Sequence, residues 1–157
     1  MVRRDDTEPL ASPAGLVHSS NEVPMRILHV VTRLGLGGAE RVAETLASGS
    51  VARGDEAALL TIVGTRDHAI ARRMRANLAA GGVELVDGGA VVNAKVAVVG
   101  GARRLALTVE RLRPDVVHLH TEIPEFAWAL ASIWSRRVRV TPVVRTIHNT
   151  RLWDGWP

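Results

Sequence analysis

The chain has 157 residues, enough for one domain with a core, and its composition of 46% apolar but only 3% aromatic residues indicates a core of small aliphatic side chains. Lysine and arginine number 20 against 16 acidic residues, which gives a net charge of +4. These basic residues are spread along the chain without interleaved aromatic side chains, so no nucleic-acid partner is expected. The absence of cysteine excludes disulfides and thiolate metal sites.

Residues 1–24 are polar, contain prolines and show no apolar periodicity, so we expect a disordered extension, with Met25 as an alternative start. The segment resembles no signal peptide, and no later stretch reaches the roughly 18 apolar residues of a membrane span. We therefore expect a cytoplasmic protein. The arginine pairs, such as Arg136-Arg137, are expected to be solvated charges. Their alternative role is peripheral contact with an anionic membrane at its inner face.

From Met25 onward, short β-branched runs alternate with helical stretches, which is the pattern of βαβ units and a parallel sheet. Strands are predicted at 27–31, 57–63, 83–86, 116–119 and 143–147. Each run is almost continuously apolar, as is typical of strands that helices cover on both faces. The sequence therefore predicts an α/β fold with a Rossmann-like parallel sheet flanked by helices.

Helices are predicted at 39–53, 69–78, 95–113 and 124–134. The third has apolar residues at three- and four-residue steps along one face. It contains Gly100-Gly101, and each glycine costs about 1 kcal/mol relative to alanine, so the helix is expected to start or bend there. Pro124 suits the first turn of the fourth helix. Because no closing helix follows the fifth strand, we expect 25–157 to be an incomplete domain.

A glycine-rich segment, TRLGLGGAER at 32–41, follows the first strand. Ligands of open parallel sheets bind at the carboxyl ends of the strands, and the next helix would present free N–H groups to an anion such as a diphosphate. Gly37 and Gly38 are therefore candidate ligand contacts, and the alternative is that they only form a tight turn. The dinucleotide fingerprint is broken, because Glu40 stands where its third glycine should be.

Histidines and a carboxylate follow the fourth and fifth strands. His118, His120 and Glu122 follow one, and His148 follows the other. Strand alternation places His118 and His120 on the same side of the sheet. Such groups hold hydroxyls, transfer protons or bind metal. We expect His118 to be a structural residue and His120 and His148 to be site residues. No metal site is expected, because no ligand spacing such as H-E-x-x-H is present.

Five segments together resemble a known family: MRILHVV at 25–31, GLGGAER at 35–41, LASGSVARGDE at 46–56, RPDVVHLH at 113–120 and TIHN at 146–149. In order and spacing they are similar to the N-terminal domain of family 4 glycosyltransferases, over about residues 25–150. The resemblance implies a GT-B enzyme, in which two Rossmann-like domains face each other across a cleft. Such an enzyme moves a hexose, with retained configuration, from a nucleotide-sugar donor to a glycan, lipid-linked or small-molecule acceptor. The N-terminal domain mainly binds the acceptor.

The resemblance also implies roles for individual residues. The family's glycine loop maps onto Gly37 and Gly38, and its histidine near the transferred sugar maps onto His148, the candidate catalytic residue. Together with the residues at the strand ends, the candidate substrate-binding residues are Gly37, Gly38, His120, Glu122 and Asn149. It implies no cofactor besides the donor substrate. The family's C-terminal donor-binding half is absent from this sequence, so we expect the isolated chain to be inactive until that half is supplied in cis or in trans. The alternatives are a stand-alone binding module that pairs with a separately encoded catalytic half, or a different Rossmann-type nucleotide-binding enzyme.

Overall fold

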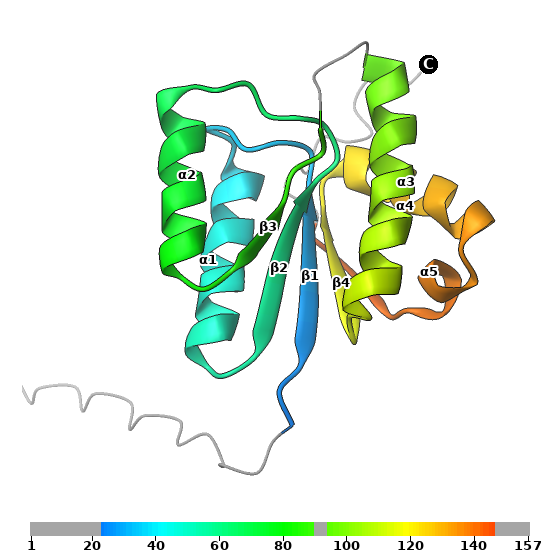
Figure 1. Cartoon of the computed structure of the whole chain (residues 1–157), viewed down its shortest axis with the longest axis horizontal. Helices are drawn as coiled ribbons and strands as arrows, with labels where there is room; N and C mark the ends of the chain where they lie inside the picture. The colour runs from blue at the N-terminus through cyan, green and yellow to red at the C-terminus, as the bar shows by residue number, and fades with distance from the viewer. Residues whose placement is uncertain (1–22, 90–93, 147–157) are drawn as a thin grey trace, which may run out of the picture.

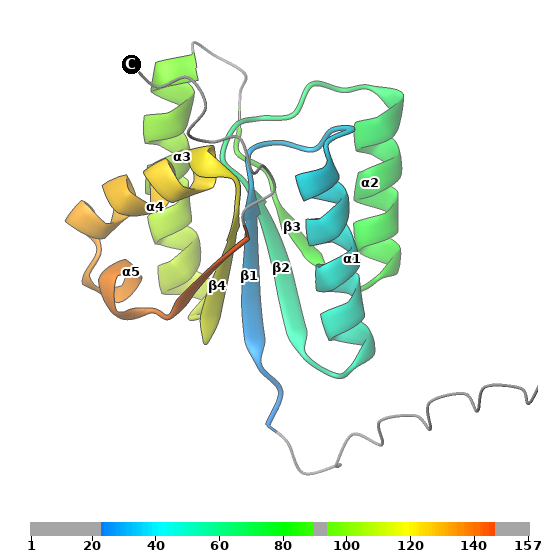
Figure 2. The same cartoon turned by 180° about the vertical axis from the view of Figure 1, so that it is seen from behind.

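A parallel sheet with helices on both faces forms the core of the molecule (Figures 1 and 2). The computed structural model describes residues 23–89 and 94–146. In chain order the elements are β1 Arg26–Val31, α1 Gly38–Ala52, β2 Glu56–Thr61, α2 Ala69–Ala80, β3 Glu84–Val86, α3 Ala94–Leu112, β4 Val116–His120, α4 Glu122–Trp134, α5 Arg136–Val140 and β5 Val143–Thr146.

The strand order is β3-β2-β1-β4-β5, and each neighbouring pair is parallel. The chain builds outward from β1 to β3 on one side and then returns to place β4 on the other side of β1. The order therefore reverses between β1 and β4, which is the switch point where open α/β sheets bind their ligands. In register, His29 of β1 lies between Leu59 of β2 and His118 of β4.

Two apolar clusters, one on each face of the sheet, make up the core. Leu28 and Val30 of β1 pack with residues of α3, α4 and α5 on one face. Val31 and Leu59 pack with α1 and α2 on the other face. Neighbouring residues of one strand belong to different clusters because side chains alternate across a strand. This arrangement confirms the predicted α/β sheet flanked by helices.

All five predicted strands and all four predicted helices are present, with shifts of a few residues at their ends. The helix α3 runs through Gly100-Gly101 and begins before them, at Ala94, so the expected start at the glycines is wrong. The sequence analysis also missed α5, whose five residues RRVRV carry no helical periodicity. Ser135 caps this short helix, since its Oγ accepts a hydrogen bond from the Val138 N–H at 3.2 Å.

The edge strand β5 differs from the expectation that every strand is covered on both faces. Val143 and Val144 are 48% and 50% exposed. The strand pairs with β4 at the edge of the sheet, and the helices of the described chain pack mainly on the other strands. Residues 1–22, most of the predicted disordered extension, lie outside the described residues, so that expectation stays a prediction. None of the helices described here is both long and apolar enough to span a membrane.

Candidate functional site

The glycine-rich loop between β1 and α1 is anchored at its start and open at its end. Leu34 is fully buried, and its backbone N–H donates a 2.9 Å hydrogen bond to Thr65 Oγ1. Gly37 is the N-cap residue of α1 with φ −65° and ψ 150°, and Gly38 is the first helical residue. Glycine has no side chain with which to cap the helix. The Glu40 carboxylate lies beside Gly37, and it would have to move for an anion to reach the first-turn N–H groups.

Backbone strain does not explain why this loop contains glycines. The glycines with positive φ in the described chain are Gly54, Gly82 and Gly89, none of which lies in the loop. A Cβ atom added at Gly35 or Gly38 would meet no atom within 4 Å. Neither turn geometry nor packing in this chain therefore requires glycine at those two positions. The space beside them is open to a ligand that approaches the backbone closely.

Two threonines mark the switch point at the carboxyl ends of β1 and β4. Thr32 directly follows β1 and Thr121 directly follows β4, and their Oγ1 atoms lie 3.1 Å apart. Thr121 has φ +83° and ψ 172°, a conformation that β-branched residues rarely adopt. Strain of this kind costs about 1–3 kcal/mol and is concentrated at functional sites. The sequence analysis listed neither threonine as a site residue, although both stand at the strand ends where ligands bind.

Three histidines, His29, His118 and His120, form a cluster beneath these strand ends, hereafter the histidine cluster. Their ring centroids lie 4.0 Å apart for the pair on β4 and 5.3 and 5.6 Å from His29 to the other two. His29 Nδ1 and His120 Nε2 are 3.3 Å apart. On the other side of the cluster, His118 Nε2 lies 2.6 Å from the Thr146 hydroxyl of β5. The cluster thus connects the three strands β1, β4 and β5.

Burial lowers the pKa of one member of the histidine cluster, His29. His29 is 2% exposed, and burial, with a smaller contribution from the charge of His118, lowers its pKa to about 4. The ring is therefore neutral near pH 7. Its Nε2 atom is buried and has no hydrogen-bond partner within the part of the chain that the structure describes. Buried ring nitrogens are normally paired, so this one needs an explanation.

The structure places the predicted site residues at different depths. His118 and His120 lie on the same side of the sheet, as predicted. His120 is fully buried, so its role in substrate binding stays a prediction. Glu122 is exposed as the first residue of α4 and lies beside the strained Thr121.

The remaining predicted residues follow β5. His148 and Asn149 lie outside the described residues, and their roles also stay predictions. The sequence analysis missed His29, which lies within a predicted strand. Only the pairing of β1 with β4 brings it beside His118.

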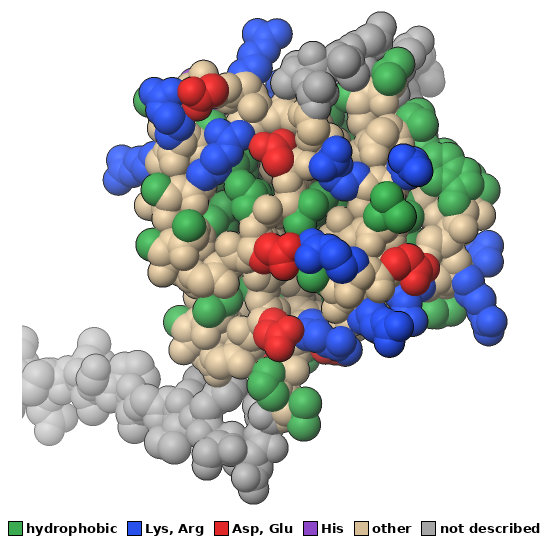
Figure 3. Space-filling view, viewed as in Figure 1, with side chains coloured by type: hydrophobic (Ala, Val, Ile, Leu, Met, Phe, Trp, Pro, Cys, Tyr) green, Lys and Arg blue, Asp and Glu red, His purple; other side chains and the backbone are tan. Residues whose placement is uncertain are grey.

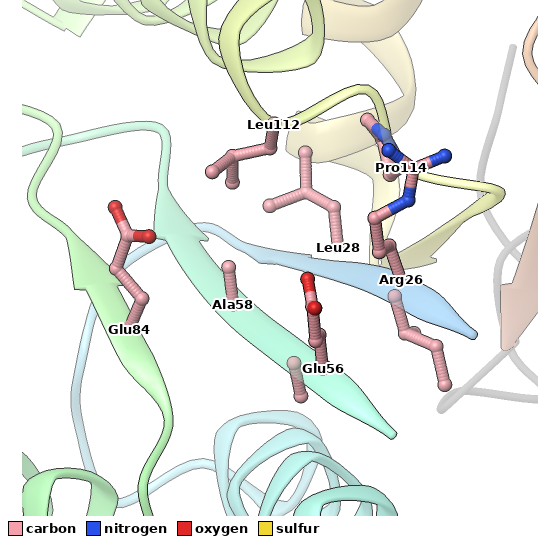
Figure 4. Close-up of a pocket in the computed structure, with 9 residues that line it drawn as sticks. Arg26, Leu28, Glu56, Ala58, Glu84, Leu112 and Pro114 are labelled. Carbon is pink, nitrogen blue, oxygen red and sulfur yellow. The ribbon is translucent and has the colours of Figure 1, made fainter. Parts of the chain in front are cut away.

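A hollow of about 70 Å³ lies at the amino ends of the strands, opposite the strand ends described above (Figure 4). It is lined by the first residues of β1 and β2, Arg26 and Glu56, together with Glu84, Leu112 and Pro114. Since ligands of parallel sheets bind at the carboxyl ends of the strands, this hollow is at the wrong end for the candidate site. Its volume is also below that of ordinary ligand pockets, about 300–1,000 Å³.

Comparison with known proteins identifies relatives of the chain. Residues 36–157 match the family model of Glycosyltransferase Family 4, which is more than half of the chain. A search of curated proteins gave no match.

Two solved structures resemble the fold. A glycosyltransferase from Rickettsia africae ESF-5 has a TM-score of 0.58 at 16% identity, and Anabaena HepE in complex with UDP and glucose has a TM-score of 0.54 at 18% identity. In each case the match covers 80% of this chain and 30% of the other chain. At these identities the likeness supports the fold, and the chain spans about a third of the length of either protein.

Proposed function

The chain belongs to glycosyltransferase family 4, and we propose that it is the acceptor-side domain of an enzyme that transfers a hexose from a nucleotide-sugar donor to an acceptor. The proposed acceptor is a glycan, a lipid-linked sugar or a small molecule. One solved protein of similar fold, HepE, was crystallised with UDP and glucose, which supports a nucleotide sugar as the donor class. The fold-level likeness to the Rickettsia africae glycosyltransferase is consistent with this assignment.

The observation that carries the proposal is the open glycine-rich loop at the switch point. Gly35 and Gly38 have space where other residues carry a side chain, and Gly37 leaves the start of α1 without a side-chain cap. A diphosphate or a sugar hydroxyl placed there would receive backbone N–H hydrogen bonds and the favourable field of the helix dipole. Glu122, exposed at the next strand end, is suited to accept hydrogen bonds from sugar hydroxyls.

We further propose that His148 acts beside the transferred sugar with Asn149 next to it, and that a donor-binding half completes the cleft in cis or in trans. The family match, which includes these two residues, supports the first part. Reading the gene and its neighbours for a second Rossmann-like half tests the second part. If neither location encodes such a half, the proposal that a donor-binding half completes the cleft is wrong.

A ligand-binding experiment on the 157-residue chain tests the role of the glycine loop. Saturation-transfer NMR with UDP, inorganic diphosphate and a panel of oligosaccharides reports contact with the chain. We expect Gly38→Val to fill the open space and to lower the signal of the bound ligand at least about threefold, since the added atoms meet the ligand and not the protein. Gly49→Ala in the same helix is the matched control, because its Cβ would make only an ordinary 3.7 Å contact with Arg53.

Two results would contradict the assignment of this loop. One is binding that is equal in Gly38→Val and in the parent chain. The other is binding that both glycine variants weaken equally, because that pattern reports a change in the helix and not in a ligand contact. Circular dichroism of both variants checks that the fold is retained.

An apolar and basic surface on α3, α4 and α5 favours an acceptor at a membrane. Phe126, Ile133 and Trp134 of α4 are 62%, 68% and 52% exposed. A hollow of about 650 Å³ lies between α3 and the end of α4, with Arg103 and Arg136 in its wall. Figure 3 shows the apolar and basic side chains on this side of the molecule. We propose that this surface rests on the anionic inner face of a membrane that carries the acceptor.

Co-sedimentation with vesicles tests the membrane contact. We expect more chain to bind vesicles containing phosphatidylglycerol than vesicles of phosphatidylcholine alone, and added salt to weaken the binding. Ile133→Ser with Trp134→Ser should lower the bound fraction at least about threefold by removing inserted apolar area. Arg73→Ser, on the exposed part of α2, is the control. Equal binding to both vesicle types, or no effect of the double variant, would contradict the proposal.

A further inference from the structure

We propose that the histidine cluster, His29, His118 and His120, binds a divalent transition-metal ion of the zinc class. One ring nitrogen from each histidine can be chosen so that all three lie within 4.8 Å of one another. In a tetrahedral zinc site with bonds of about 2.0–2.1 Å, ligand atoms lie about 3.4 Å apart. The most widely spaced of these nitrogens therefore need to approach one another by about 1.4 Å to surround an ion.

The spacing of His29 and His120 already matches that of two neighbouring zinc ligands. His29 is 2% exposed, its Nδ1 faces His120 Nε2 at 3.3 Å, and its Nε2 is buried without a partner among the residues described. A neutral imidazole has one N–H and one lone pair. In either tautomer, pairing Nδ1 with His120 leaves the other nitrogen unsatisfied. A cation held between His29 Nδ1 and His120 Nε2 takes one lone pair from each ring, and the ring proton of His29 then lies on Nε2.

The surroundings suit a metal of the zinc class better than a hard cation. The three rings lie 4.0–5.6 Å apart, so a nitrogen from each can reach one ion. Imidazole nitrogen favours zinc, cobalt, nickel and copper over magnesium or calcium. The Thr146 hydroxyl, 2.6 Å from His118 Nε2, is placed to hold the His118 ring as an outer-shell partner.

Access and location complete the argument. His118 is partly exposed, which provides a route for an ion into the cluster. Three protein ligands leave one coordination position for water or another ligand, as in open zinc sites. The site would tie β1 to β4 directly below Thr32 and Thr121. The sequence analysis expected no metal because no local ligand spacing is present, whereas here the ligands come from two strands that only the sheet brings together.

A metal titration of the 157-residue chain tests the inference. The chain is freed of metal with a chelator, and Co²⁺ is titrated while its visible absorption is followed. Zn²⁺ then competes the Co²⁺ out. We expect one equivalent of Zn²⁺ with a dissociation constant below about 10 μM and the intense absorption typical of four-coordinate Co²⁺. Nitrogen-15 NMR of the imidazoles should show the metal-induced shift on three rings.

Variants locate the site. His118→Asn changes the partly exposed member of the cluster, so the fold should survive, and we expect the affinity for Zn²⁺ to fall at least about tenfold. His68→Asn is the matched control, because His68 caps α2 outside the cluster and asparagine preserves an N-cap. Binding that is absent, or that His118→Asn leaves unchanged in a folded chain, would overturn the inference and leave the three rings as a hydrogen-bonded core.

Discussion

The first and the fifth strands each contain two adjacent valines, yet the two pairs have opposite surroundings. Val30 and Val31 of β1 are 0% and 1% exposed, whereas Val143 and Val144 of β5 are 48% and 50% exposed. The central strand has a neighbour on each side and a helical layer on each face. The edge strand has one neighbour, β4. An apolar run therefore predicts a strand, while burial depends on the position of that strand in the sheet order.

This difference also separates the two kinds of stabilisation in the domain. Both core clusters contain residues of β1 and β2, and one of them also contains residues of β4, whereas neither contains a residue of β5 within the chain described. Buried apolar area provides most of the favourable free energy of folding. The free energy of unfolding should therefore respond strongly to changes in β1 and weakly to the same changes in β5.

The largest expected effect comes from shortening the valines of the central strand. Val30→Ala and Val31→Ala each remove two buried methyl groups and leave a cavity, so each should lower the free energy of unfolding by about 2–3 kcal/mol. The two side chains lie on opposite faces, so their effects should nearly add, to about 4–6 kcal/mol. Val143→Ala and Val144→Ala should each cost less than about 1 kcal/mol. Urea unfolding followed by circular dichroism measures all four.

Equal losses of unfolding free energy for the valine variants of β1 and β5 would contradict the difference between the two strands. Such losses would mean that other residues or another molecule cover the side chains of β5 in solution. A loss below about 1 kcal/mol for Val30→Ala would instead mean that the core relaxes around the shortened side chain.

The second expected effect is that the free energy of unfolding depends on pH. The reason is that β1 contains the buried, ionisable His29, whereas the ionisable side chain of β5 is exposed. The pKa of His29 is about 4 in the folded chain and 6.5 when unperturbed. Above pH 6.5 both states are neutral and the native state keeps its full stability. As the pH falls from about 6.5 to about 4, His29 binds a proton in the unfolded chain but stays neutral in the folded chain. The free energy of unfolding should fall by about 3 kcal/mol across that window.

Urea unfolding between pH 7.5 and pH 4, with a chelator to exclude metal, measures this dependence. His29→Gln should flatten it. Asp115 does not obscure the window. Its hydrogen bonds with Arg26 lower the pKa of its carboxyl group below 3.8, so its contribution is lost at lower pH. A stability that stays constant from pH 7 to pH 4 would contradict the burial of a neutral His29.

The sequence predicted most of the sheet because its signals are local. The β-branched runs and the helical periodicity each lie within one element, and the glycine-rich loop stands where the strand-end rule expects it. The helix α5 was missed because five residues are too few to show a helical period. The exposure of Val143 and Val144 was missed because it depends on the strand order, which local patterns do not contain.

The candidate site shows the same limit. Strand alternation placed His118 and His120 together because they lie two residues apart in one strand. His29 lies about ninety residues earlier, and only the register of β1 with β4 places it in the cluster. The strained backbone of Thr121 has no sequence signal either, since threonine is a poor choice for that conformation.

The smallest expected effect is at the two adjacent glycines of α3, the helix that covers one face of the central strands. A Cβ atom at Gly101 would lie 2.3 Å from the Ile62 carbonyl oxygen and 2.7 Å from its side chain, whereas at Gly100 it would meet nothing within 4 Å. Gly101→Ala should therefore push the helix from the sheet and lower the free energy of unfolding by about 1–3 kcal/mol. Gly100→Ala should raise it by about 0.5–1 kcal/mol through helix propensity.

The sign of the difference between these two variants is the decisive quantity, because both introduce the same methyl group into the same helix one residue apart. Urea unfolding of both chains under one condition measures it. If Gly101→Ala were as stabilising as Gly100→Ala, α3 would not pack closely on the end of β2. The distinction between covered central strands and an exposed edge strand would then lose the close contact between Gly101 of α3 and Ile62, the residue that directly follows β2.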